Sequence, residues 1–468
     1  MNNENRFPLH PISAAATALS LTLACVVSAN AQVAPSGSGA TTSGSGAPTG
    51  STSTPTSSPS PAPGGMSMGG IPVDPNPYYL GVSQAFTHDS NVYRIPDGPA
   101  DTYSTTSLLG GFDQRIGRQR VYGRAIVSGN RYLNEDTLDN VSYGVTTGID
   151  WETVEHLSGN ISASFNQNLA SQPASSGIPV ATRNVAQTQG IGARIRWGGV
   201  SLLTLEAGAD YSNLDYSLPQ YVTSESSHSS ANIYLYYRGG GPLRVGAGFR
   251  GDRTYTPQAF LDPATGQYQS TKLTGQHFDV LLDYDVTGQV SADTRLSYTK
   301  QTSTGGGNVD FSGFTGNAGL TWQATGKITV RADAAREAGF DAHTYNYFSF
   351  TQTGNGLLLT PVVGLYQNNQ ITTSAGVSLM YAATAKISTT ANARYIRAHL
   401  SNVDVATAAA APDTFDVLKV VSLGAGYEIT RNWGAACSLG YEKRDVTGAA
   451  NFSYDAKTIT CSTQFTWR

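Results

Sequence analysis

Two segments near the C terminus, residues 432–442 and 458–467, alternate between apolar side chains and small or polar ones. In the first segment Trp433, Ala435, Cys437, Leu439 and Tyr441 alternate with Asn432, Gly434, Ala436, Ser438 and Gly440. Because successive side chains of a strand point to opposite faces, each segment has one apolar and one polar face. The same period recurs down most of the chain, and a transmembrane β-barrel is the fold that needs this pattern so often.

The composition suits such a barrel better than a large soluble core. Charged residues make up only 13% of the 468 residues, whereas soluble domains carry about 25%. A surface that meets lipid needs few charges, and the 51 glycines and 25 tyrosines fit tight packing inside a barrel and aromatic girdles at its rims. Outside the leader no run of 18 apolar residues occurs, so the pattern excludes a helical membrane protein.

Residues 1–31 have the pattern of a secretory signal peptide. An apolar run from about residue 12 to residue 27 is followed by Ala29 and Ala31, the small residues that signal peptidase needs at positions minus three and minus one. We expect cleavage after Ala31. Lipidation of Cys25 is the weaker alternative, because Thr22 stands where a lipoprotein signal has leucine.

Residues 32–76 consist almost entirely of Ser, Gly, Thr, Ala and Pro. Such a segment buries too little apolar area to offset its ordering entropy, so we predict a disordered periplasmic tail. It is a passive spacer or a tether to peptidoglycan or a periplasmic partner. Residues 77–468 then form the barrel.

Turn signals divide residues 78–468 into segments of about 14 to 17 residues. Eight tight turns alternate with nine longer connections, which requires eighteen antiparallel strands, or 16 to 20 if one hairpin is missed or merged. An even number returns both termini to the periplasm, as in bacterial outer-membrane barrels. The longest connection, residues 340–368, is aromatic enough to fold inward as a constriction or gate, and an extracellular flap is the alternative.

Aromatic residues recur on the apolar face just before the tight turns. The tryptophans in this position are Trp151, Trp197, Trp322, Trp433 and Trp467. Amphipathic rings prefer the headgroup zone of a bilayer, so we predict a periplasmic aromatic girdle.

The polar face of the strands predicts a wet lumen that carries both signs of charge. Its predicted lining residues are Arg194, Arg196, Arg238, Arg244, Arg250, Arg295, Arg331, Arg394, Asp150, Glu206, Asp210, Asp279, Asp283, Asp293, Tyr234 and Tyr236. Each charge on the lipid face would cost about 2 to 4 kcal/mol at mid-bilayer, which explains their confinement to one parity.

Cys437 and Cys461 lie on the last two predicted strands, at equal distances from the centre of their connection near Ala449. A symmetric hairpin therefore sets them directly opposite each other, both facing outward. A cross-strand disulfide is expected if the pair is of the closer, non-hydrogen-bonded kind. Two thiols facing lipid are the alternative.

No arrangement of residues predicts catalysis, a metal site or a cofactor. The run His88, Asp89, Ser90 has the residue types of a hydrolytic triad, but sequence neighbours rarely converge in space. Asp283 and Asp285 could pair as acid and base for glycoside cleavage, yet a solvated lumen face is the simpler interpretation. The histidines lack metal-ligand spacing, and a net charge of −4 does not favour nucleic acid as a partner.

The first long connection contains Asp89-Ser90-Asn91-Val92-Tyr93-Arg94-Ile95-Pro96-Asp97-Gly98, followed by Asp101-Thr102. This run resembles the first loop of the β-barrel porin family associated with bacterial exopolysaccharide clusters, which includes the EpsL-like outer-membrane export proteins. The surrounding strand pattern extends the resemblance from about Tyr78 to Arg468. It implies an outer-membrane location, no catalytic residues, and a role in passing an extracellular polysaccharide or in assembling its exit.

The chain departs from a typical outer-membrane barrel at its end. It closes with Phe465-Thr466-Trp467-Arg468 rather than with a terminal Phe. Because the alternating aromatics remain, we expect the barrel-assembly machinery to accept it.

Residues and resemblance together predict a porin-like channel in the bacterial outer membrane, with lipid, the barrel-assembly machinery, polysaccharide and periplasmic export components as partners. A general diffusion porin for small polar solutes is the main alternative. An outer-membrane polysaccharide-modifying enzyme and a non-transporting assembly anchor are the others.

Overall fold

The computed structural model describes residues 77–154, 156–170, 183–198, 202–261, 267–304, 310–338, 340–353, 356–369, 371–400, 414–447 and 453–467. Its described strands are β1 (Tyr78–Asp89), β2 (Asp101–Ile116), β3 (Gln119–Tyr132), β4 (Asn140–Glu152), β5 (Leu157–Leu169), β6 (Val185–Trp197), β7 (Leu203–Tyr216), β8 (Ser226–Arg238), β9 (Leu243–Leu261), β10 (Tyr268–Thr287), β11 (Val290–Thr304), β12 (Phe311–Thr325), β13 (Ile328–Glu337), β14 (Phe340–Thr353), β15 (Gly356–Asn369), β16 (Ile371–Ala382), β17 (Ile387–Leu400), β18 (Thr414–Glu428), β19 (Trp433–Thr447) and β20 (Tyr454–Trp467). Two short 3-10 turns, η3 (Asp136–Leu138) and η4 (Pro219–Ser224), lie in connections.

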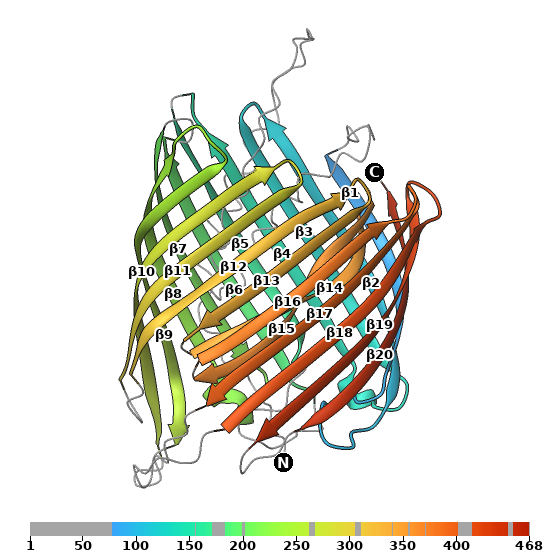
Figure 1. The fold of residues 1–468 in the computed structure, drawn as a ribbon. Coiled ribbons are helices and arrows are strands. Elements are labelled where there is room, and N and C mark those ends of the chain that lie inside the picture. The colour runs from blue at the N-terminus through green and yellow to red at the C-terminus, as the bar shows by residue number, and fades with distance from the viewer. Residues whose placement is uncertain are drawn as a thin grey trace, which may run out of the picture. The chain divides into compact units, whose positions relative to one another are not determined.

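Eighteen of these strands form one closed antiparallel sheet (Figure 1). Each strand pairs with the next in the chain, except that β13 pairs with β16, and the last strand β20 pairs with the first strand β1. Every backbone ladder is therefore closed, as a bilayer requires of a spanning sheet. The prediction of a transmembrane barrel of about eighteen strands is confirmed.

The two ends of the barrel differ in the length of their connections. Short connections such as residues 117–118 and 288–289 lie at one end, which we call the turn end, and the long connections lie at the other, the loop end. Gly117 has a φ of +64°, a conformation that glycine adopts at no steric cost, and this permits the two-residue turn between β2 and β3.

Strand lengths vary more than the alternation predicts. β13 has 10 residues, whereas β9 has 19 and β10 has 20. The expected range of about 14 to 17 is therefore wrong for these strands. The paired strands β9 and β10 are longer than the roughly 9 to 11 residues that cross the hydrocarbon. Their hydrogen bonding extends into residues that the sequence pattern assigns to a loop.

The outer wall is apolar. Side chains that alternate along each strand are strongly exposed although they are hydrophobic, for example Leu80, Val82 and Phe86 on β1 and Leu203 and Leu205 on β7. A soluble protein rarely exposes so continuous an apolar surface, whereas a barrel embedded in lipid must do so. Within the described residues no helix is long and apolar enough to cross a membrane.

The segment from residue 340 to residue 369 is a β-hairpin rather than the irregular loop that the sequence predicts. β14 and β15 pair with each other in a separate two-stranded sheet. Their backbone lies near β17, β18 and β19. Whether the hairpin constricts or gates the channel stays a prediction, because its side chains are outside the described set.

The predicted signal peptide, residues 1–31, and the predicted tail, residues 32–76, lie outside the described residues. The first strand, β1, starts at Tyr78.

Candidate functional site: the charged inner wall and the loop-end mouth

The inner wall consists of the residues that alternate with the exposed apolar set. On β9, for instance, Leu243 and Phe249 are exposed on the outer face, and Arg244 and Arg250 take the opposite parity. All residues predicted to line the lumen fall on this inner face. Arg238 lies next to the turn end and is exposed, and Arg331 is exposed on the inner face of β13.

One group of inward side chains surrounds Glu206 on β7. Its carboxylate, 3% exposed, accepts hydrogen bonds from Arg196 Nε at 3.0 Å and from Arg196 Nη2 at 2.7 Å. Arg194 Nε lies 3.5 Å from the other carboxylate oxygen. The two arginines supply this nearly buried carboxylate with charge partners, because an unpaired buried charge is strongly disfavoured.

Tyr236, Arg244 and Asp283 form a second group on β8, β9 and β10. The guanidinium of Arg244 stacks on the ring of Tyr236, 3.7 Å from its centroid, and Arg244 Nη1 lies 3.5 Å from Asp283 Oδ2. The tyrosine ring lies across Gly246, where a Cβ would meet the ring at 2.5 Å. The Tyr236 hydroxyl and both Asp283 oxygens are buried and have no hydrogen-bond partner among the described residues.

A third group joins the inner wall of β8 to β12. Asp279, fully buried, accepts a hydrogen bond from the Tyr234 hydroxyl at 2.8 Å and one from Arg250 Nε at 3.2 Å. Asp252 hydrogen-bonds His277 Nε2, and His277 Nδ1 lies 2.8 Å from the Thr299 hydroxyl. These contacts cross neighbouring strands and order the side chains along the wall.

Further ion pairs continue around the barrel. Arg394 Nη1 lies 3.3 Å from Asp333 Oδ2, and Arg295 Nη2 lies 3.9 Å from Glu337 Oε1. Arg120 hydrogen-bonds Asp113 at 2.6 Å and Asp150 at 3.3 Å. Most charges of the wall are thus matched by a neighbour of opposite sign, which lowers the net field along the lumen.

The loop-end mouth contains a second network, built on the connection between β1 and β2. Asp89 accepts hydrogen bonds from Arg94 Nη1 at 2.8 and 2.9 Å and from the Asn91 backbone N–H at 2.9 Å. Arg94 Nε also lies 3.8 Å from Glu442 on β19, and Glu442 accepts a hydrogen bond from the Tyr454 hydroxyl. Burial disfavours the charge of Arg94, but the carboxylates of Glu442 and Asp89 hold its pKa above the usual range.

Asn91 ties the same connection to the last strand. Its side-chain amide donates to the Ile95 carbonyl at 2.7 Å and to the Asp455 carbonyl at 3.1 Å. Ser90 completes the junction, because its N–H donates to the Lys457 carbonyl and its hydroxyl accepts from the Lys457 N–H. The run that resembles the porin-family loop is therefore the segment that fastens β1 to β20 at the barrel's closing seam.

Several residues of these networks lie on the inner face by strand alternation but are absent from the predicted lining set. Asp252 and His277 share the inner face with Arg250, and Asp416 pairs with Arg444 at 2.6 Å near the mouth. Alternation could have found all of these residues. It could not have found Arg94, because that residue lies in a connection and reaches the wall only through the loop's fold.

The three residues of the possible hydrolytic triad do not converge. His88 points outward and its Nδ1 lies 2.9 Å from the Thr102 hydroxyl, whereas Asp89 points inward to Arg94 and Ser90 bonds the β20 backbone. These three residues therefore form no hydrolytic triad. Among the described residues no group of three His, Cys, Asp or Glu could hold a metal ion.

The structure places the predicted girdle on the outer wall at the turn end. Trp197, Trp322, Trp433 and Trp467 are between 44% and 63% exposed, and Trp151 is half-buried. Cys437 and Cys461 face each other on β19 and β20 with a Cα–Cα distance of 4.1 Å, and their sulfur atoms are bonded.

The chain resembles several solved outer-membrane proteins in its overall barrel architecture. It covers 99% of the Pseudomonas aeruginosa protein OccK1 (OpdK) with 83% of its own length, at 11% identity and a TM-score of 0.43. With 81% of its own length it covers 63% of the FrpB iron transporter of Neisseria meningitidis, at 11% identity and a TM-score of 0.45. With 83% of its length it covers 98% of Acinetobacter baumannii OccAB3, at 12% identity and a TM-score of 0.41.

No protein-family model matches the chain. No curated protein matches it in sequence.

Proposed function

We propose that this protein is an outer-membrane channel through which an extracellular polysaccharide passes. The observation that carries the proposal is the contrast between the two faces of one closed sheet. The outer face is apolar, and the inner face presents guanidinium, carboxylate, hydroxyl and tyrosine groups. Sugars bind to such walls through hydroxyl hydrogen bonds to charged groups and through contact with aromatic faces.

The mixed charge of the wall favours a neutral or weakly charged polymer. Glu206, Asp279 and Asp333 each have an arginine partner, so the wall does not present a continuous row of charges of one sign, which would select a strongly charged solute. Exposed groups of the inner face, such as Arg238 and Arg331, are able to exchange hydrogen bonds with successive sugar hydroxyls.

The proposed orientation puts the loop end outside the cell and the N-terminal tail in the periplasm. Long connections face the exterior in bacterial outer-membrane barrels, whereas short turns face the periplasm. The resemblance of the first connection to the loop of the exopolysaccharide-associated porin family supports the same assignment. Periplasmic export components would then meet the turn end.

A general diffusion porin is the second candidate. The pairing of most wall charges favours it, because a polar wall without a dominant sign passes many small solutes. Planar-bilayer recordings with the full chain distinguish the two functions. Large steady currents that purified polysaccharide does not change would refute the export proposal, and currents that the polymer blocks or gates would support it.

The enzyme and anchor alternatives have their own tests. Asp293 lies directly opposite Asp283 on the neighbouring strand, so Asp283→Asn tests the enzyme. We expect neither the native chain nor this variant to cleave purified polysaccharide, and cleavage by the native chain that the variant loses would support the enzyme. Deletion of residues 36–63 tests the anchor. If export stops while bilayer conductance is unchanged, the tail rather than the pore carries the function.

A further inference from the structure

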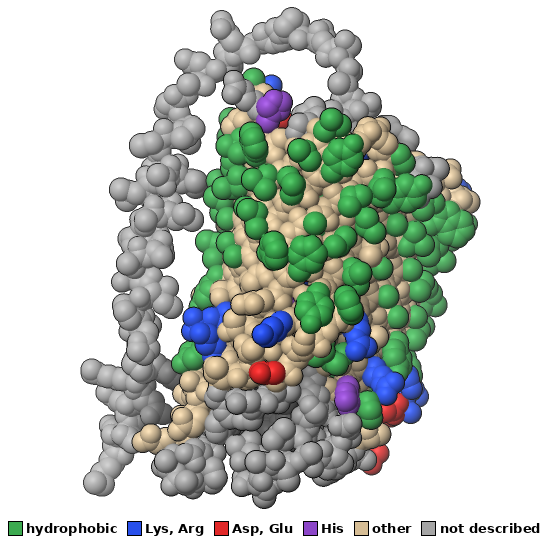
Figure 2. Space-filling view, turned by 60° about the vertical axis from the view of Figure 1, so that its left-hand side comes forward, with side chains coloured by type: hydrophobic (Ala, Val, Ile, Leu, Met, Phe, Trp, Pro, Cys, Tyr) green, Lys and Arg blue, Asp and Glu red, His purple; other side chains and the backbone are tan. Residues whose placement is uncertain are grey.

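The outer wall near the loop end carries cations where a membrane protein should have few. Arg253 on β9, Lys300 on β11 and Arg336 on β13 belong to the outward-facing parity and are exposed. Among the described residues none of the three has an ion-pair partner. Figure 2 shows Lys and Arg side chains gathered below the apolar surface, toward the end of the barrel opposite the C terminus in Figure 1.

The register of the sheet places these cations at the edge of the apolar band. A row of paired outward residues starts at Trp197 in the turn-end girdle and ends at Arg336. The row runs through Leu205, Leu235, Ala247, Val280, Leu296 and Gly316. Because strands in such barrels tilt by about 40°, each step to the next strand, about 4.8 Å, climbs roughly 3 Å. Seven steps climb about 20 Å, close to the height of the apolar band.

An aromatic row marks the same boundary on the neighbouring strands. Phe249, Phe278, Tyr298 and Phe314 pair in sequence across β9 to β12 and are all exposed. The next outward row toward the loop end contains Gly251, Gln276 and Lys300. Lys300 and Arg253 therefore lie directly beyond the rings, where lipid headgroups lie, and Arg336 lies level with the row on β13.

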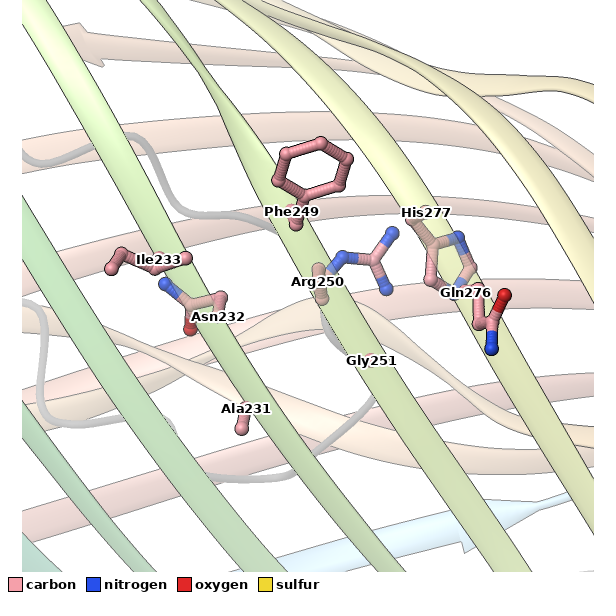
Figure 3. A pocket seen from close by; sticks show the side chains of 8 residues that line it. All are labelled: Ala231, Asn232, Ile233, Phe249, Arg250, Gly251, Gln276 and His277. Carbon is pink, nitrogen blue, oxygen red and sulfur yellow. The ribbon is translucent and has the colours of Figure 1, made fainter.

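A hollow in the wall lies beside Arg253 and Lys300. It has a volume of about 440 Å³ and is lined by residues of β8, β9 and β10 (Figure 3). Five of its lining residues belong to the outward parity, and they are Ala231, Ile233, Phe249, Gly251 and Gln276. The hollow exists because Ala231 and Gly251 carry little or no side chain between two larger apolar residues.

We propose that Arg253, Lys300 and Arg336 bind the phosphate groups of a glycolipid in the leaflet at the loop end, and that one of its acyl chains lies in the hollow at Gly251. Guanidinium and ammonium groups are the usual protein partners of phosphate. Apolar side chains at the hollow suit a hydrocarbon chain. The site lies on the outer wall, so it stands or falls independently of what passes through the lumen.

Native mass spectrometry of the full chain in detergent tests the site. The probes are diphosphoryl lipid A and the same lipid with both phosphates removed. We expect the native chain to bind the phosphorylated lipid more tightly. Each surface charge near a headgroup changes binding about fivefold, so the triple variant Arg253→Gln, Lys300→Gln, Arg336→Gln should bind about a hundredfold more weakly.

A matched variant keeps the charge change but moves it to the other end. Arg118, Lys327 and Lys386 are exposed at the turn end, so Arg118→Gln, Lys327→Gln, Lys386→Gln should leave lipid binding unchanged. Gly251→Leu should weaken binding without altering charge, and it fits the fold because a Cβ there meets only the Gly275 carbonyl, at 3.9 Å. Equal binding of both lipids by the native chain, or equal losses in the two triple variants, would overturn the proposal. The first of these comparisons needs no variant to fold.

Discussion

The fastening of the first connection to the closing seam predicts a local opening when Asp89 loses its charge. In Asp89→Asn the side chain keeps its size, and its remaining oxygen can still accept the Asn91 N–H. The charge that attracts Arg94 is lost together with one of its two hydrogen bonds, and Arg94 keeps the Asn91 carbonyl and Glu442 at 3.8 Å. Both partners are mostly buried, with side chains 9% and 14% exposed.

The size of the effect follows from what remains around Arg94. Breaking a buried ion pair costs about 3 to 5 kcal/mol, and a hydrogen bond to a charged group contributes about 1.5 to 3 kcal/mol. Because Glu442 and residual exposure still stabilise the cation, we expect about 2 kcal/mol. Opening of residues 90–98 should then increase about thirtyfold, since 1.4 kcal/mol is a factor of ten.

Amide hydrogen exchange of the barrel in detergent measures this opening. The relevant amides are those of Ser90, Asn91 and Gly98, which donate within the connection or to β20. Asp97→Asn is the matched control, because Asp97 is exposed, its side chain makes no hydrogen bond to a described residue, and asparagine tolerates its φ of 52°. If protection changes less than threefold in Asp89→Asn, or changes equally in both variants, the Asp89–Arg94 ion pair does not hold the first connection to the closing seam.

Three further predictions concern the wall, the seam hairpin and the mouth. Gly246→Val should displace the Tyr236 ring, because a Cβ at this position already meets the ring at 2.5 Å. Bilayer recordings should then show a changed conductance. Gly241→Val is the control and should leave the conductance unchanged, because a Cβ there meets no atom within 4 Å. The Cys437–Cys461 disulfide links two residues 24 positions apart, so replacing both cysteines with serine should lower the free energy of unfolding, measured by urea titration, by about 3 kcal/mol. In the native chain, alkylation before reduction should label neither cysteine. The pKa of Asp139 is lowered by hydrogen bonds from the Tyr132 N–H and from Arg131. The stability that these bonds contribute should be present above the unfolded pKa of about 4 and lost as the pH falls through the lower folded pKa. Hydrogen exchange at the Tyr132 amide should show this pH dependence in the native chain and lose it in Asp139→Asn.

Alternation allowed most of the barrel to be predicted. A side chain's face follows from its parity alone, because the strand period is two, so the inward position of Arg250 and the outward position of Trp197 need no knowledge of the partner strand. Turn residues such as Gly117 separate consecutive strands, and their count gives eighteen. Symmetry about the centre of the last connection, near Ala449, also set Cys437 opposite Cys461.

The hairpin shows where this reasoning stops. Residues 340–369 have strand-like composition in the middle of a long connection, and parity cannot say whether two such strands join the barrel or pair only with each other. The outcome depends on whether β13 pairs with β16, which is a contact between distant segments.

The order of the amino acids is enough to tell which residues face lipid and which face water, because that property depends only on position within a strand. Which charges meet depends on how distant strands are brought together. Arg94 and Glu442 are far apart in the chain and approach because β20 closes on β1 and the first connection folds back over that seam. Such pairs depend on register and closure summed over the whole sheet, and no local pattern contains that information.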